Sequence, residues 1–388
     1  MIDIETERVA QRVPDDEWRA DTRFCHALRV ARVVEETHDA MSIVFEVPPE
    51  LAEVFAYRAG QFLSFKVPFA GRVLVRSYSL SSSPDVDALP KVTVKRVDDG
   101  RISNWMNDRV RAGSTLMVVP PAGLFVLDPR SQRDLVLWSG GSGITPCISI
   151  IKTALVSTQR RLSLVYANRD ARSIIFRDEL EALRDRHPDR LRIVHSLDDV
   201  NSFVTREDVA REMAGEQGRD CYLCGPAAFM DTVEHALRDL GVARERIHIE
   251  RFLSPVDHSG EAVQGGRLES RPTRSEPQAS EGGPLHGVVA SADDELAPAS
   301  IAIVLDGREH QVPYAAGERV LEAARRAGLD PPFSCEEGYC GCCMARLSSG
   351  RVKMAANDCL TPELQGEGWV LTCQSRCVGG EVRIEYPD

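Results

Sequence analysis

Length, composition and charge limit what this chain can be. Its 388 residues exceed one ordinary hydrophobic core, which predicts two or three domains. With 43% hydrophobic and 27% charged residues, and no apolar run near the roughly 20 residues of a membrane span, a fibrous, disordered or membrane-crossing protein is not expected. The net charge of −12 argues against nucleic acid as a partner, because phosphate binding needs basic patches.

Residues 1–25 form an N-terminal extension that matches no informative pattern. They carry acidic residues and no apolar core, so a secretory signal of the usual form is not expected, and we predict a cytoplasmic location. Seven of the 11 cysteines fall between Cys335 and Cys377. In a cytosolic chain such clustering predicts metal or redox chemistry before disulfides.

Residues 26–130 contain short β-branched runs separated by Gly, Pro and Asp, which predict a small antiparallel barrel. On one of these strands Arg76, Tyr78 and Ser79 form R-x-Y-S. The ring can stack on a flavin, the guanidinium can pair with a pyrophosphate, and a hydroxyl can hydrogen-bond near flavin N5. Alone, the tetrapeptide is weak evidence, because a Tyr and two Ser on a strand more often serve packing and solvent contacts.

A second anion-binding feature follows in the same region. The strand VTVKR leads into GRISNWM, a Gly-Ser turn that opens a helix. A helix N-terminus offers free amide groups to a phosphate. Ser103 and Asn104 are therefore candidate contacts for the same pyrophosphate.

Residues 131–253 alternate apolar strands with helical stretches, the pattern of a parallel sheet. Helices are predicted over 148–155, 176–186 and 227–240. The sequence GGSGITP follows the first strand, and its glycines allow a dinucleotide to approach the backbone at the start of a helix. A tight turn without a ligand is the alternative. Cys224, Gly225 and Pro226 end another strand, where ligands of open α/β sheets bind, although Cys224 could instead be a small buried residue.

The choice between NADH and NADPH depends on the residues after LVYA. Arg169 or Arg172 could bind a 2′-phosphate, whereas Asp170 would repel one. These residues leave both cofactors open.

Residues 254–299 are rich in Ser, Gly, Pro and charge, and they predict a flexible linker with an r.m.s. reach on the order of 35 Å. A compact unit follows over 300–388. It holds Cys335, Cys340, Cys343 and Cys373, whose first three members match the C-x₄-C-x₂-C spacing of plant-type [2Fe-2S] ligands. A structural zinc site usually has a second C-x₂-C pair, which is absent from this unit. Cys342 breaks the spacing and is interpreted as a small residue packed near the cluster.

The motifs RSYSL, GGSGITP, CGP and CEEGYCGCC occur in this order, and together they resemble the ferredoxin-NADP reductase superfamily with a C-terminal plant-type ferredoxin. The chain is most similar to reductases of Rieske-type oxygenases, in particular those serving 3-ketosteroid 9α-hydroxylases. The resemblance implies a multidomain fold: an antiparallel β-barrel FAD domain, an α/β parallel-sheet nicotinamide domain and an α+β β-grasp [2Fe-2S] ferredoxin domain.

The resemblance also implies roles for individual residues. FAD would be bound by the R-x-Y-S residues and by Lys95, Ser103 and Asn104. Thr145 would lie near the flavin ring, and Glu250 with Phe252 would cover its other side. The nicotinamide would be bordered by Gly141, Ser142, Gly143 and Cys224, with Arg169 near the ribose. Ser79, Cys224 and Glu250 are thus expected nearest to the reacting atoms.

The implied function is electron transfer from NADH through FAD and the [2Fe-2S] cluster to a separate terminal oxygenase. NADH is the usual donor in this branch, and NADPH stays open. Cys342 departs from the steroid reductases and is similar to the reductase of the hybrid-cluster protein. A betaine demethylase, a phenylacetyl-CoA epoxidase or the hybrid-cluster protein are therefore alternative partners. A non-enzymatic electron carrier or redox sensor is a further alternative, against which the intact R-x-Y-S and GGSGITP motifs argue.

Overall fold

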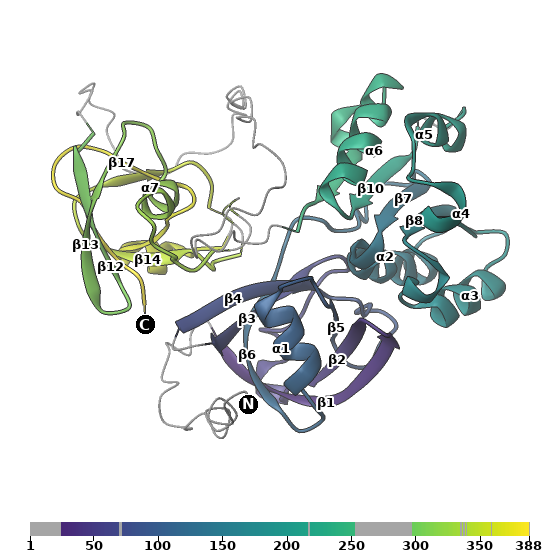
Figure 1. Cartoon of the computed structure of the whole chain (residues 1–388), viewed down its shortest axis with the longest axis horizontal. Coiled ribbons are helices and arrows are strands. Elements are labelled where there is room, and N and C mark those ends of the chain that lie inside the picture. The colour runs from purple at the N-terminus through teal and green to yellow at the C-terminus, as the bar shows by residue number, and fades with distance from the viewer. Residues whose placement is uncertain are drawn as a thin grey trace, which may run out of the picture.

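The structure of this chain is a computed structural model, which describes residues 25–69, 72–215, 218–252, 297–333, 336, 338, 340–357 and 359–387. Nearly all of the predicted N-terminal extension and linker lies outside these residues, and so does Cys335. The described residues form three folded parts (Figure 1). No helix among them is both long and apolar enough to cross a membrane.

The first part is a six-stranded antiparallel barrel in the order β4-β3-β6-β1-β2-β5. A bridge between Leu80 and Val92 joins the two end strands and closes it. Helix α1, Arg101–Arg109, inserts Ile102 and Met106 into the barrel core. The strands are β1 (His26–Thr37), β2 (Ala40–Glu46), β3 (Phe62–Phe69), β4 (Arg72–Ser79), β5 (Lys91–Lys95) and β6 (Thr115–Ala122).

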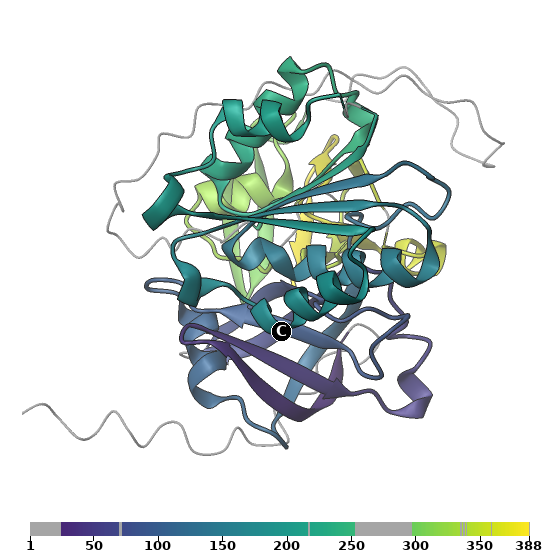
Figure 2. The same ribbon diagram turned by 90° about the vertical axis from the view of Figure 1, so that its right-hand side faces the viewer.

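The second part is a five-stranded parallel sheet in the order β11-β10-β7-β8-β9 with helices on both faces (Figure 2). Side chains of β7 alternate between the faces. Leu135 and Leu137 pack toward α2 and α3, whereas Val136 and Trp138 pack toward α5 and α6, so the first four residues of this strand are apolar on both faces. The strands are β7 (Leu135–Gly140), β8 (Leu162–Asn168), β9 (Leu191–Leu197), β10 (Asp220–Cys224) and β11 (Ile247–Glu250). The helices are α2 (Ile144–Ser157), α3 (Arg177–Arg186), α4 (Asp198–Asn201), α5 (Arg206–Glu212) and α6 (Ala227–Asp239).

The third part is a mixed five-stranded sheet, β13-β12-β18-β14-β16, covered by helix α7. Strands β12 and β18 are parallel, and the other pairs are antiparallel. A two-stranded sheet, β15-β17, lies beside it. The elements are β12 (Ser300–Leu305), β13 (Arg308–Pro313), α7 (Val320–Arg326), β14 (Met344–Ser349), β15 (Val352–Met354), α8 (Pro362–Gly366), β16 (Trp369–Leu371), β17 (Ser375–Cys377) and β18 (Arg383–Glu385).

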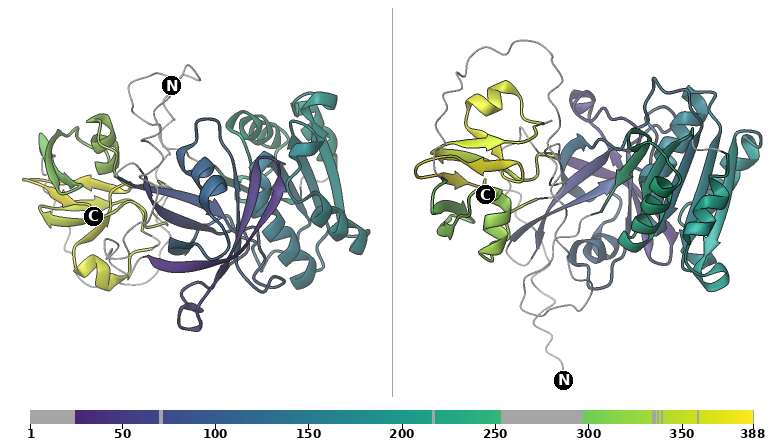
Figure 3. Two further views of the ribbon diagram at one scale, coloured as in Figure 1. Left: turned by 60° about the horizontal axis from the view of Figure 1, so that its bottom comes forward. Right: turned by 90° about the horizontal axis from the view of Figure 1, so that it is seen from above.

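Along the long axis of the molecule, the barrel lies between the other two parts (Figures 1 and 3). The predicted sequence of antiparallel barrel, parallel α/β sheet and α+β unit is confirmed. Helix α2 begins four residues earlier than predicted, at Ile144, because the glycine turn leads directly into it.

Candidate functional site

The R-x-Y-S residues lie on β4, where alternation divides them between two faces. Arg76 pairs with Phe65 of β3 and shares its face with Tyr78, whereas Ser79 pairs with Phe62 on the opposite face. The rings of Tyr78 and Phe65 are 5.9 Å apart. Burial raises the pKa of Tyr78, so its hydroxyl stays protonated. This strand therefore presents a cation and an aromatic ring on one side and a hydroxyl on the other.

Ser103 and Asn104 brace the turn before α1. The Ser103 hydroxyl accepts a hydrogen bond from the amide of Val97 at 3.3 Å, and the Asn104 amide nitrogen donates to the Val97 carbonyl at 3.1 Å. No side chain caps the helix at Gly100. Backbone amides of the first turn are thus the donors best placed for an anion, while both side chains hold the turn in shape.

The glycine turn of GGSGITP forms a short 3-10 segment, Gly141–Gly143, between β7 and α2. Gly141 has φ of +52°, a left-handed conformation that favours glycine. A Cβ on Gly143 would collide with the carbonyl oxygen of Cys224 at the end of β10. Strands β7 and β10 are neighbours where the strand order reverses, and such a point is the usual ligand crevice of open α/β sheets.

The remaining candidates at this edge lie close to the crevice. Cys224 and Glu250 are directly paired neighbours on β10 and β11, and Phe252, 43% exposed, follows two residues later. Burial raises the pKa of the Cys224 thiol well above its usual value, so it stays neutral. The Thr145 hydroxyl, buried in the first turn of α2, donates to the carbonyl of Ser142 at 3.0 Å. These residues shape the crevice without adding a nucleophile.

Two functional contacts were not predicted from the sequence. The buried Tyr166 hydroxyl donates to the Gly141 carbonyl at 3.1 Å and accepts from the Ile175 amide at 3.3 Å. This contact holds the glycine turn against strand β8. Asp39, on the barrel, lies 3.1 Å from Arg169 of the parallel-sheet part. A buried tyrosine on a strand carries no local signal of such a role, and Asp39 is 130 residues from its partner.

Lys95 also contacts both parts. Its Nζ lies 3.7 Å from Asp39 Oδ2 and 3.8 Å from the position of a Cβ on Gly141. The ammonium group therefore lies over the glycine turn. This placement suits a phosphate of the dinucleotide at least as well as one of the flavin.

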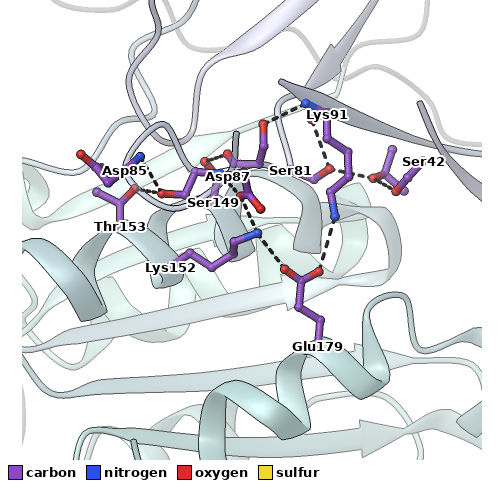
Figure 4. Close-up of polar contacts among 12 residues, drawn as sticks. Ser42, Ser81, Asp85, Asp87, Lys91, Ser149, Lys152, Thr153 and Glu179 are labelled. Atoms are coloured by element: carbon purple, nitrogen blue, oxygen red, sulfur yellow. Dashed lines mark hydrogen bonds and ion pairs between the residues drawn. The ribbon is translucent and has the colours of Figure 1, made fainter. Parts of the chain in front are cut away.

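Helix α2 is joined to the barrel along its middle by buried polar contacts (Figure 4). The Lys152 side chain is 3% exposed, and its Nζ lies 2.6 Å from Asp87 of the barrel and 2.7 Å from Glu179 of α3. One turn away, the Ser149 hydroxyl donates to the Ser82 carbonyl at 2.5 Å. Because α2 begins at the glycine turn, these contacts fix that turn relative to the barrel.

Replacing Lys152 with methionine is expected to weaken the packing of α2 against the barrel. Asp87 and Glu179 would lose their shared cation, but each stays about 30% exposed, so we expect a loss of about 2 kcal/mol, less than for a fully buried pair. The midpoint of thermal flavin release, followed by flavin fluorescence, measures it. Lys353→Met, at an exposed position on β15, is the control. Equal midpoints for the two variants would contradict the assignment.

Three of the predicted iron ligands lie together in the third part. Cys340, Cys343 and Cys373 are all buried, and contact with Cys373, together with burial, raises the pKa of the Cys343 thiol well above its usual value. Glycines at positive φ, Gly338 and Gly341, flank Cys340. The described residues contain no three side chains already arranged to coordinate a metal, and Cys335 lies outside them, so the ligand set stays a prediction.

The loop around these cysteines fits an iron-sulfur group. Buried thiols are costly to ionise alone, whereas iron binds them as thiolates. The backbone amide of Cys342 donates to Cys340 Sγ at 3.5 Å, and the side-chain amide nitrogen of Gln374 donates to Cys373 Sγ at 3.7 Å. Such donors stabilise the negative charge of a cluster.

The cysteine loop also contacts the barrel. Cys340 and Cys342 pack against Phe62 of β3 and Ala122 of β6. Phe62 is the cross-strand partner of Ser79, so this contact is on the same face of β4 as the Ser79 hydroxyl. Cys342 is a partly buried packing residue here, in agreement with its interpretation from the sequence.

Comparison with known proteins assigns each part. Residues 27–127 match an oxidoreductase FAD-binding domain, 137–235 an oxidoreductase NAD-binding domain, and 303–378 a 2Fe-2S iron-sulfur cluster binding domain. The phthalate dioxygenase reductase structure shares the fold, with a TM-score of 0.55 and 24% identity over 93% of this chain and 98% of that one. The chain is therefore an electron-transferring oxidoreductase that uses FAD, NAD and a [2Fe-2S] cluster.

The family is defined by relatives of nearly the same length. The chain is 41% identical to the ferredoxin reductase component of 3-ketosteroid-9-alpha-monooxygenase from Rhodococcus rhodochrous, over 92% of this chain and 96% of that protein. It is 32% identical to one of the subunits of 1,2-phenylacetyl-CoA epoxidase from Escherichia coli, over 93% and 97%. The chain belongs to this family of three-domain ferredoxin reductases, whose members serve as components of oxygenases.

Proposed function

We propose that this chain transfers electrons from NADH to a Rieske-type terminal oxygenase that hydroxylates a 3-ketosteroid. The observation that carries the proposal is the 41% identity to a 3-ketosteroid-9-alpha-monooxygenase reductase component over nearly the full length of both chains. The identity to the phenylacetyl-CoA epoxidase protein, 32% over a similar length, is lower. An epoxidase, a betaine demethylase and the hybrid-cluster protein are the competing partners.

The cofactors supply the redox chemistry: when bound, FAD accepts a hydride from NADH, and the [2Fe-2S] cluster carries the electrons onward one at a time. The chain's residues bind and orient them. Arg76 would pair with the FAD pyrophosphate, Tyr78 would stack on the flavin, and the Ser79 hydroxyl would donate near its N5. No general acid or base from the protein is needed for these steps.

The nicotinamide would enter the crevice between the glycine turn and Cys224, with Lys95 placed for a phosphate. Glu250 and Phe252, at the end of β11, would cover the other side of the flavin. Cys335, Cys340, Cys343 and Cys373 would hold the two irons. The packing of the cysteine loop on the face of β4 that carries Ser79 supports a short path from flavin to cluster.

Reconstitution with candidate oxygenases tests the partner. The purified reductase is combined with NADH, O₂ and, separately, a Rieske 3-ketosteroid oxygenase, a glycine betaine oxygenase and a phenylacetyl-CoA epoxidase core. We expect substrate-dependent NADH oxidation with hydroxylated steroid, at a rate roughly tenfold above the other pairings, because complementary surfaces raise the rate of encounter. Turnover with another oxygenase and none with the steroid enzyme would contradict the proposal.

A further inference from the structure

A carboxylate from the barrel lies at the edge of the nicotinamide domain. Asp39 is in the turn between β1 and β2, and its side chain is 14% exposed. The Thr37 hydroxyl donates to Asp39 Oδ1 at 2.7 Å, and the Asp39 carbonyl accepts from the Arg96 amide at 2.7 Å. The other carboxylate oxygen, Oδ2, faces Arg169 at 3.1 Å and Lys95 at 3.7 Å. Asp39 is thus held in place while it pairs with two cations.

Both cations lie where a dinucleotide would pass. Lys95 covers the glycine turn, and Arg169 directly follows β8, the neighbour of β7. The side-chain amide of Asn168, next to Arg169, is buried beside Tyr166. This edge therefore offers two cations to the phosphates of a dinucleotide.

Asp170, the carboxylate that the sequence places near a 2′-phosphate, is engaged within its own turn. The Asp170 side chain accepts hydrogen bonds from the amides of Arg172 and Ser173 and from the Ser173 hydroxyl, so it is turned onto its own backbone. Asp39 is the carboxylate that faces Arg169. His38 Nε2 lies 3.9 Å from the same Asp39 oxygen and is 56% exposed, and it adds a charge only when protonated.

We propose that Asp39 is a specificity-determining residue, which selects NADH over NADPH by pairing with Arg169 and Lys95 from the neighbouring domain. This inference rests on the proposed function, in that a nicotinamide dinucleotide binds at the glycine turn. Two cations and one carboxylate leave a single net positive charge for the pyrophosphate. A 2′-phosphate would add about −1.5 to −2 charges, and it would compete with Asp39 for Arg169. Without the carboxylate, both cations would be available to it.

The test is the ratio of kcat/KM for NADPH to kcat/KM for NADH, measured with ferricyanide as electron acceptor. Asp39→Asn is expected to raise this ratio roughly tenfold or more, because a charge close to the 2′-phosphate is removed. Adding Arg169→Ala to Asp39→Asn should cancel the gain. Asp39→Glu, which keeps the charge, should stay closer to the wild type. Asp39→Ser also removes the charge, and serine is common in turns. If the asparagine variant loses its FAD, the same ratio of kcat/KM values is measured for the serine variant instead.

Glu46→Gln is the matched control, because it removes an exposed carboxylate from the same barrel, where Glu46 pairs with Arg29. The ratio should not change. An unchanged ratio in both Asp39→Asn and Asp39→Ser, equal losses with both cofactors, or a gain that survives Arg169→Ala would overturn the inference. If the wild type reduces its flavin with NADH and the Asp39 variants leave the ratio unchanged, this inference alone is refuted. If the wild type uses neither NADH nor NADPH, the proposed function is refuted as well.

Discussion

Cys373→Ser is expected to abolish the [2Fe-2S] cluster while NADH still reduces the flavin. Cys373 follows β16, is 1% exposed and contacts Cys343, and it is separated from the other predicted ligands by 30 residues or more. A serine hydroxyl is a far poorer ligand for iron than a thiolate. The barrel and the parallel sheet have cores of their own, so the flavin and nicotinamide sites should remain.

Two electron acceptors separate these effects. Ferricyanide accepts electrons from the flavin, and NADH-ferricyanide activity should stay within about twofold of the wild type. Reduction of cytochrome c through the cluster should fall by roughly tenfold or more, because the one-electron carrier is lost. The visible and electron paramagnetic resonance spectra report the cluster directly.

Other cysteines provide the controls. Cys377 is 4% exposed on β17 and packs in a different core cluster from Cys343 and Cys373, so Cys377→Ser should keep the cluster spectrum. Cys342→Ser should keep it as well, since Cys342 packs against the barrel. A [2Fe-2S] spectrum that persists in Cys373→Ser would mean that another thiol is the fourth ligand. Loss of that spectrum on adding Cys342→Ser would then identify Cys342.

The sequence predicted what depends on local pattern. Alternating apolar residues and turn residues indicated the barrel strands, and the strand-turn-helix pattern indicated the glycine turn between β7 and α2. The cysteine spacing predicted the iron-sulfur unit, which the match to a 2Fe-2S domain confirms. Each of these signals lies within a few residues, so no knowledge of tertiary contacts was needed.

The contacts between domains could not be predicted in this way. Asp39 and Arg169 come from different domains, and so do Lys152 and Asp87. Their partners depend on how two independently patterned units pack together. The same limit applies to the contact of Lys95 with the glycine turn of the neighbouring domain, while its assignment to FAD stays a prediction.

The second large effect is expected for Gly143→Ala, in the glycine turn. Gly143 has φ of −61°, which alanine adopts without strain, so backbone conformation does not require glycine here. The contact does. An added Cβ would collide with the Cys224 carbonyl and lie 2.7 Å from the Gly225 amide nitrogen. Both obstacles are backbone atoms, so no side chain can rotate away, and the turn must move from β10.

That movement should affect hydride transfer more than FAD binding. A shift near 1 Å at a reacting centre can lower a rate by about 100-fold, so kcat/KM for NADH-dependent flavin reduction should fall by roughly that factor. The overpacked contact should also destabilise the nicotinamide domain by about 1–3 kcal/mol. Stopped-flow absorbance of flavin reduction measures the rate, and the FAD content and cluster spectrum should be unchanged.

Gly218→Ala is the matched control, since an added Cβ there meets no atom within 4 Å. It should leave flavin reduction unchanged. If Gly143→Ala behaved like Gly218→Ala, the close approach of the glycine turn to β10 would be irrelevant to the nicotinamide site. If instead FAD content fell together with the rate, the movement would have passed along α2 into the barrel, through the contacts of Ser149 and Lys152. The ratio of FAD content to rate therefore separates a local change in the crevice from a change in how the two domains are joined.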